Sequence, residues 1–200
     1  MSFSSELKHY LSVYSKFVST STAVAMSFRT SFVLMMIMDL LFFSSAYFTV
    51  DFIFDHVDQV MGWSRNQFML YLSYMLLMDV FHMIILSQNF WRFSDDLKSG
   101  QLDYTILRPL SAIFSVFFRY LRPSSIPTLI PATAVFIYYG MLNNFTIIDW
   151  VITPVLLILS IVLLALIEFI ISCAMFWLVE GVGINFLRMQ MQQVSRWPDL

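Results

Sequence analysis

The sequence predicts an all-α protein, a polytopic integral membrane bundle of about four transmembrane helices with interfacial amphipathic helices beside them. Two observations lead to this fold class. Of the 200 residues, 59% are hydrophobic and only 12% are charged, whereas charged residues make up about a quarter of an ordinary globular chain. The apolar residues also gather into four runs, each long enough to cross a hydrocarbon layer of roughly 30 Å at 1.5 Å per helical residue.

The N-terminal segment, residues 1–29, is predicted to contain an interfacial amphipathic helix at residues 3–18. Aromatic and aliphatic side chains recur there every three or four residues, while Lys8 and Lys16 fall mostly between them. Such a helix lies in the headgroup layer with its apolar side toward the acyl chains and its lysines toward the headgroups. A solvated tail helix is the alternative.

Residues 30–89 are predicted to contain spans one and two. Span one, at residues 30–50, is interrupted only by Asp39. A short acidic loop follows, and span two at residues 68–87 carries Asp79 in its interior. Both runs are close to the 20 residues that a membrane crossing needs.

Residues 124–179 are predicted to contain spans three and four. Span three, at residues 124–141, has two prolines in its first turns, where a missing amide donor costs least. Span four, at residues 150–178, has Glu168 in its interior and tryptophans at both ends as interfacial anchors. The polar residues 180–200 are expected to form a cytoplasmic tail.

A polar interval at residues 90–123 separates spans two and three. We expect Gly100 to end one short helix in a left-handed conformation, Asp103 to cap the next helix, and Pro109 after Arg108 to end that one. The charged side chains of this interval would each cost several kcal/mol in hydrocarbon. The interval is therefore predicted to face water and a water-soluble partner.

The basic residues predict the orientation of the chain. Of its 11 Lys and Arg residues, Arg65 alone falls on one side of the predicted spans and the others fall on the opposite side. Because cytoplasmic loops carry the excess of Lys and Arg, both termini and residues 90–123 are predicted to be cytoplasmic.

Several chemistries have no support in the sequence. None of the five glycines is followed by lysine, so a phosphate-binding Walker A loop is absent and any ATPase must be another chain. His9, His56 and His82 are scattered and Cys173 stands alone, so no metal site is expected. The net charge of −2 gives no basic field for nucleic acid. We therefore expect no cofactor, no nucleic-acid partner and no catalytic residues.

Four ionisable residues lie within the predicted spans: Asp39, Asp79, His82 and Glu168. An ionisable group inside a membrane is a candidate functional residue, because moving it from water into hydrocarbon costs free energy. Three interpretations are open. The groups can be structural contacts between helices; the three acids can form a proton relay, if they converge; or Asp79 and His82, three residues apart on one helical face, can serve a membrane enzyme.

The run KSGQLDYTILRPLSAIF, Lys98–Phe114, resembles the signature of ABC-2 type permeases of bacterial ABC exporters. In that family a Gly, a Leu-Asp pair and an Arg-Pro pair recur between the second and third spans. The matching residues here are Gly100, Leu102, Asp103, Leu107, Arg108 and Pro109. Further similarity appears at Gly62-Trp63-Ser64 and at Arg196-Trp197-Pro198, so the resemblance covers nearly the whole chain.

The resemblance implies a permease subunit of a bacterial exporter in the cytoplasmic membrane. Such a subunit dimerises, as a homodimer or heterodimer, and is driven by a separate ABC ATPase. Because the interval that holds the six matching residues joins spans two and three directly, we expect it to be the coupling segment; a solvated loop whose charges only set the topology is the alternative. Family members continue past the Arg-Trp-Pro region into further spans, so the resemblance also implies that this chain is truncated. A proton-coupled secondary carrier that uses Asp39, Asp79 and Glu168 is the rival interpretation.

Overall fold

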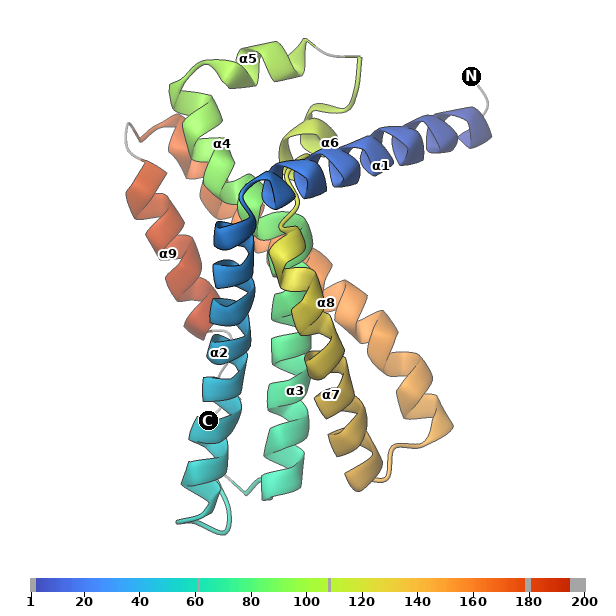
Figure 1. Ribbon diagram of the computed structural model, residues 1–200, viewed down its shortest axis with the longest axis vertical. Helices are drawn as coiled ribbons and strands as arrows, with labels where there is room; N and C mark the ends of the chain where they lie inside the picture. Colours follow the sequence, from blue (N-terminus) through green and yellow to red (C-terminus); the bar gives the residue numbers. More distant parts are fainter. Residues whose placement is uncertain (1–2, 61, 108, 179–180, 195–200) are drawn as a thin grey trace.

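The computed structural model describes residues 3–60, 62–107, 109–178 and 181–194, which form helices joined by short turns with no β-strand among them (Figure 1). The predicted all-α fold is therefore confirmed. The helices, in chain order, are α1 (Phe3–Ser27), α2 (Arg29–Phe54), α3 (Arg65–His82), the π-helical turn η1 (Met83–Ser87), α4 (Gln88–Lys98), α5 (Gln101–Ile106), α6 (Ala112–Phe117), the 3-10 helix η2 (Pro123–Thr128), α7 (Leu129–Leu142), α8 (Ile147–Cys173), the 3-10 helix η3 (Ala174–Phe176) and α9 (Gly181–Val194).

Four helical stretches among the described residues are long and apolar enough to cross a membrane. They are Arg29–Phe54, Arg65–Lys98, Pro123–Leu142 and Ile147–Phe176. The first three contain the predicted spans one to three, and the fourth covers predicted span four except for its last two residues, so the expectation of about four transmembrane helices is confirmed. Large apolar side chains stay exposed along α2 and α8, as expected for helices whose outer surfaces contact lipid.

The second span is longer than the sequence suggested. The elements α3, η1 and α4 follow one another without a break, so one long helix runs from Arg65 to Lys98. The separate short helix expected before Gly100 is instead the last part of this long helix. Neither glycine nor proline occurs between Arg65 and Lys98 to end it, and a single π-helical turn, at Met83–Ser87, is absorbed within it.

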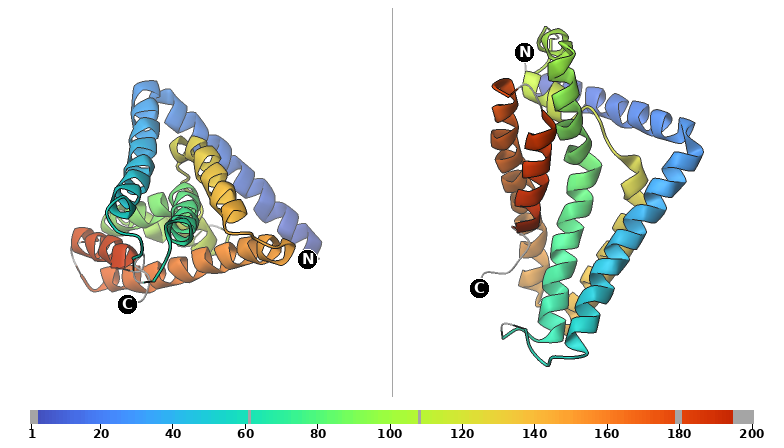
Figure 2. Two further views of the ribbon diagram at one scale, coloured as in Figure 1. Left: turned by 90° about the horizontal axis from the view of Figure 1, so that it is seen from below. Right: turned by 90° about the vertical axis from the view of Figure 1, so that its left-hand side faces the viewer.

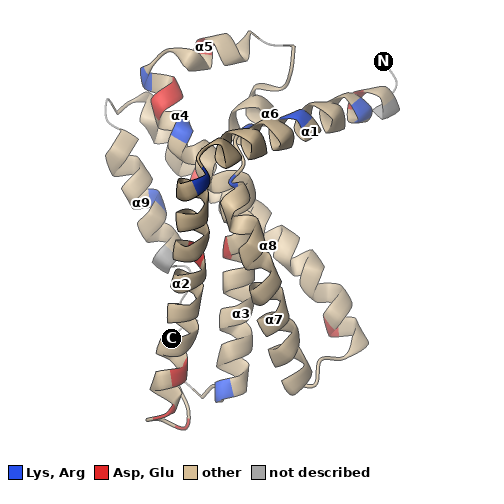
Figure 3. Cartoon of the chain, in the orientation of Figure 1, with Lys and Arg blue, Asp and Glu red and all other residues tan. Residues whose placement is uncertain are grey.

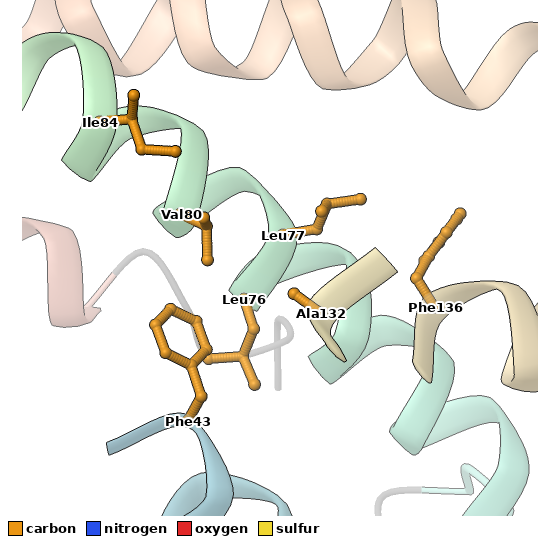
Figure 4. Packing of buried hydrophobic residues seen from close by; sticks show 7 residues of the cluster. All are labelled: Phe43, Leu76, Leu77, Val80, Ile84, Ala132 and Phe136. Atoms are coloured by element: carbon orange, nitrogen blue, oxygen red, sulfur yellow. The ribbon is translucent and has the colours of Figure 1, made fainter. Parts of the chain in front are cut away.

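The long helix lies at the centre of the bundle, with α2, α7 and α8 around α3 (Figure 2). Its apolar side chains Leu76, Leu77 and Val80 pack between Phe43 of α2 and Phe136 of α7 (Figure 4). The apolar packing of one central helix against its neighbours thus sets the relative positions of the first three spans.

A second apolar cluster joins the other half of the long helix to the segments near α5. It contains Leu86, Phe90, Phe93, Leu102, Phe117, Met175 and Ile184, which come from η1, α4, α5, α6, η3 and α9. The polar interval between spans two and three is therefore folded, and it shares a buried apolar core with η1, η3 and α9.

Helix α1 runs across the end of the bundle at a steep angle to α2 (Figure 2). Its Tyr10 ring packs edge-on against Phe114 of α6 at 5.0 Å, and the Tyr10 hydroxyl accepts a hydrogen bond from the Ser111 amide at 3.2 Å. Ser21 accepts a hydrogen bond from the Leu121 amide at 3.2 Å. These contacts tie α1 to the chain between α5 and η2, and α1 continues to Ser27, nine residues beyond the predicted helix.

Helix α9 occupies the described part of the segment that was expected to be a polar tail. It packs against α8 and α4 and contributes Ile184 to the second apolar cluster. Its first residue, Gly181, lies directly against Ser94 of α4, where an added Cβ atom would be only 2.7 Å from the Ser94 Cβ. Close approach of α9 to α4 therefore requires glycine at this position.

We expect Gly181→Ala to destabilise the protein by roughly 1–3 kcal/mol, because the new methyl group overpacks the contact with Ser94. Thermal unfolding of the detergent-solubilised protein measures the effect. Gly183→Ala is the matched control, since nothing lies within 4 Å of a Cβ atom at that position of the same helix. Restoration of stability by Ser94→Gly would confirm the contact, and equal melting temperatures for both alanine variants would contradict it.

Candidate functional site

The residues that match the ABC-2 signature lie on and around α5. Gly100 links α4 to α5 with a left-handed backbone (φ 70°), as expected. It also occupies the N-cap of α5, whereas Asp103 lies in the first helical turn, so the expectation that Asp103 caps this helix is wrong. Helix α5 ends at Ile106, before Pro109. Arg108 lies outside the described residues.

Helix α5 has one buried face and one exposed face. Leu102 and Thr105 are buried against the second apolar cluster. Tyr104, Ile106 and Leu107 are exposed, and Leu107 is exposed to 81%. These side chains lie at the end of the bundle that also carries most of the Lys and Arg residues (Figure 3). Exposed apolar side chains beside charged ones are typical of a protein contact surface.

The chain after α6 is attached to the π-helical turn of the long helix. The buried Asn89 side chain donates to the Tyr120 carbonyl at 2.8 Å and accepts from the Tyr120 amide at 2.7 Å. The Arg122 amide donates to the Ile84 carbonyl in η1 at 3.0 Å. The π-helical turn and the adjacent asparagine thus hold the two ends of the polar interval together. Sequence reasoning missed Asn89, which directly follows two other polar residues, Ser87 and Gln88, so nothing in the sequence distinguishes it.

Asp39 in span one has its own set of partners. Its carboxylate accepts hydrogen bonds from the Arg122 guanidinium at 2.8 Å and from the Ser125 hydroxyl at 2.7 Å. The ion pair connects α2 to η2. Arg122 belongs to residues 90–123, which were predicted to be cytoplasmic, and its role as the counter-ion of a residue within span one could not be read from the sequence.

Glu168 in span four lies at the centre of a buried network. It contacts His82 Nε2 at 2.7 Å and the Arg188 guanidinium at 2.8 Å, and the Glu168 and Arg188 side chains are each exposed to only 1%. The Arg188 guanidinium also lies 5.1 Å from the centre of the Phe90 ring. The network joins α3, α8 and α9 at the residue that directly precedes the π-helical turn.

His82 contacts two side chains through its two ring nitrogens. Its Nε2 atom lies 2.7 Å from the Glu168 carboxylate, and its Nδ1 atom lies 3.3 Å from the side-chain amide of Gln192. The positive charge of Arg188 compensates the Glu168 carboxylate, which limits the cost of burying it.

The four ionisable residues within the spans are not gathered into one site. Asp39 pairs with Arg122, while Glu168 and His82 share the second network. Asp79 is buried on α3, one helical turn before His82. Among the described residues, no group of three or more His, Cys, Asp or Glu side chains is placed to hold a metal ion.

The described residues thus form four apolar helices long enough to cross a membrane, with a folded polar segment between the second and third, as in a multi-pass membrane protein. A sequence model of the ABC-2 family transporter proteins matches residues 33–200, and the chain belongs to this family. It is therefore a permease subunit of an ABC transporter, a membrane component of transport. Searches of the curated proteins and of the solved structures gave no significant match.

Proposed function

We propose that this chain is the permease subunit of an exporter in a bacterial cytoplasmic membrane, and that a separate ABC ATPase drives it by binding α5. Permeases of this family associate with an ABC ATPase and usually with a second permease. The observation that carries the proposal is the exposed side of α5 and its C-cap, where the large apolar side chains Tyr104, Ile106 and Leu107 lie beside the exposed Gln101 and Asp103 on an otherwise folded and anchored segment. A partner that covers this face would remove it from water.

The proposed coupling path runs from α5 into the central helix of the bundle. Gly100 sets the direction of α5 relative to α4, and α4 is the end of the same helix that forms span two. Movement of α5 would reach span two directly, and would reach span three through the bonds of Asn89 to Tyr120 and of Ile84 to Arg122. Two spans would thus respond to one contact.

The buried ionisable groups have structural roles in this proposal. An arginine neutralises Asp39 and another neutralises Glu168, and each pair links helices that are distant in the sequence. These contacts account for Asp39 and Glu168, two of the three acids within the spans, without a proton pathway. The proton-coupled carrier and the membrane enzyme stay the rival interpretations of these groups.

We propose that residues 1–29, residues 90–123 and the start of residues 180–200 are cytoplasmic. This orientation follows from the gathering of Lys and Arg at one end of the bundle, with Arg65 at the opposite end (Figure 3). A partner ATPase requires this orientation, because it must reach α5 from the cytoplasm, where ATP is found.

Single-cysteine labelling of intact cells tests the orientation on a Cys173→Ala background. A membrane-impermeant maleimide should modify Asp58→Cys in the exposed turn between α2 and α3, and should leave Ser99→Cys beside Gly100 unmodified until the membrane is opened. The two sites are comparably exposed, so accessibility within the protein does not explain a difference. Labelling of Ser99→Cys in intact cells would place α5 outside and overturn the proposed function.

A further inference from the structure

A cavity of about 650 Å³ lies in the corner between α1, α2 and the chain that leads into η2. Its walls come from the last turns of α1, the first turns of α2, one side of α4, and residues 119–124. The cavity is on the end of the bundle where most of the Lys and Arg residues gather. It is distinct from the exposed face of α5 and does not depend on a partner ATPase.

One side of the cavity is basic. Arg92, Arg119 and Arg122 line it, together with Gln88, and no Asp or Glu side chain does. Arg122 is neutralised by Asp39, but the structure shows no ion pair for Arg92 or Arg119 among the described residues. Asp96, one turn beyond Arg92 on α4, attracts both of these arginines and offsets part of their charge.

The two arginines are held in place by an aromatic ring. The Arg92 and Arg119 guanidinium groups lie 4.8 Å and 5.1 Å from the centre of the Tyr120 ring. Tyr120 is itself fixed, because both of its backbone groups are bonded to Asn89. An anion that entered the cavity would therefore meet two positioned guanidinium groups, whose donors fit a phosphate group.

The opposite side of the cavity is apolar. It is formed by Phe17 and Val24 of α1, Phe28 at the corner, and Phe32 and Met35 of α2. Val24, Phe28 and Met35 are exposed. This side begins at the first residues of span one, where the headgroup layer meets the acyl chains in the proposed orientation. An amphipathic cavity at this depth matches a molecule with an anionic head and a hydrocarbon tail.

We propose that this cavity binds an acidic phospholipid of the cytoplasmic leaflet. The phosphodiester lies between Arg92 and Arg119, and one acyl chain follows Phe28, Phe32 and Met35 along α2. The apolar wall explains why a lipid, and not a free phosphate ion, is the occupant. The lipid would hold the crossing angle between α1 and α2, and through Tyr120 it would stabilise the chain between α6 and η2.

Native mass spectrometry of the delipidated full chain tests this site with phosphatidylglycerol as the probe and phosphatidylcholine as the neutral comparison. We expect phosphatidylglycerol to bind and phosphatidylcholine to bind much more weakly. Arg92→Gln combined with Arg119→Gln should weaken phosphatidylglycerol binding roughly 10- to 30-fold, because each basic residue contributes on the order of a fivefold gain in affinity. Lys8→Gln combined with Lys16→Gln removes the same charge from exposed positions of α1 outside the cavity and should change binding little.

A second pair of variants tests the cavity without a change of charge. Val24→Trp should fill it and displace the lipid, whereas Met26→Trp, at an equally exposed position of α1 outside the cavity, should not. If the arginine pair and the lysine pair lowered phosphatidylglycerol binding equally, the lipid would be attracted only by the overall surface charge, and the proposal would be overturned. Three other results would also overturn the proposal: inorganic phosphate displaces phosphatidylglycerol, or phosphatidylcholine binds as tightly as phosphatidylglycerol. The third is that the lipid-free chain dimerises and Val24→Trp abolishes the dimer, because the cavity would then be occupied by a second copy of the chain.

Discussion

Replacement of Glu168 by alanine is expected to lower the free energy of unfolding by about 3–5 kcal/mol, the typical cost of leaving one buried charge without its partner. Arg188 is exposed to only 1% and would keep its charge, because a guanidinium group does not deprotonate in proteins. His82 would lose its acceptor at the same time. Unfolding of the detergent-solubilised protein by titration with sodium dodecyl sulfate measures the loss.

Two further variants separate the charge from the shape of the side chain. Glu168→Gln keeps a hydrogen-bonding group but leaves the Arg188 charge uncompensated, so we expect an intermediate loss of stability. Glu168→Leu combined with Arg188→Met removes both charges and should recover most of the loss. Glu6→Ala, at an exposed acid of α1, is the control and should change stability by less than about 0.5 kcal/mol. A double variant as unstable as Glu168→Ala would contradict the charge-pair account.

Gly100→Val is expected to uncouple the spans from ATP hydrolysis. Gly100 has a φ of 70°, a conformation that costs a non-glycine residue about 1–3 kcal/mol, and a β-branched residue is especially poorly suited to it. Relief of this strain would turn α5 away from its present direction relative to α4. Spin labels at Asp58→Cys, beyond the end of α2, and at Ile147→Cys, at the start of α8, report ATP-dependent movement of the spans in the reconstituted complex. The amplitude of this movement should be roughly fivefold or more smaller in Gly100→Val than in the unchanged protein.

The matched control for this variant is Gly62→Val. Gly62 has a similar φ of 79° in the turn between α2 and α3, and neither glycine has a neighbour within 4 Å of an added Cβ atom. The strain is therefore comparable, but the site is at the opposite end of the bundle. Gly100→Asn should retain coupling, since asparagine tolerates the left-handed conformation. Equal loss of movement in both valine variants would show general destabilisation and not a role of α5 in coupling.

The spans and the left-handed glycine were predictable because each follows from a local rule. A membrane crossing requires a continuous apolar run, and the four runs stand out in the composition. Gly100 lies between two helix-forming stretches, where a left-handed residue is the common junction. The end of the helix that forms span two was predicted too early. The polar residues of α4 indicate where the membrane ends, but no glycine or proline there ends the helix.

The partners of the buried acids were not predictable from the sequence. Asp39 pairs with a residue 83 positions away, and His82 with one 86 positions away, so their proximity depends on how the spans pack. Arg188 was assigned to a cytoplasmic tail because it follows the last predicted span. Only the return of α9 along α8 places it against Glu168. The bonds between Asn89 and Tyr120 likewise depend on the path of the chain after α6.

Site-specific photocrosslinking tests the central claim, that an ATPase binds α5, most directly. A photoreactive amino acid placed at Leu107, which is exposed to 81%, should form a crosslink to an ABC ATPase co-expressed with the chain. The same amino acid at Ile147, which is exposed to 84% at the opposite end of the bundle, should form none. A crosslinked ATPase at Leu107 alone is the predicted result. Crosslinking at neither position while the ATPase still co-purifies would contradict the claim and place the contact elsewhere on the permease.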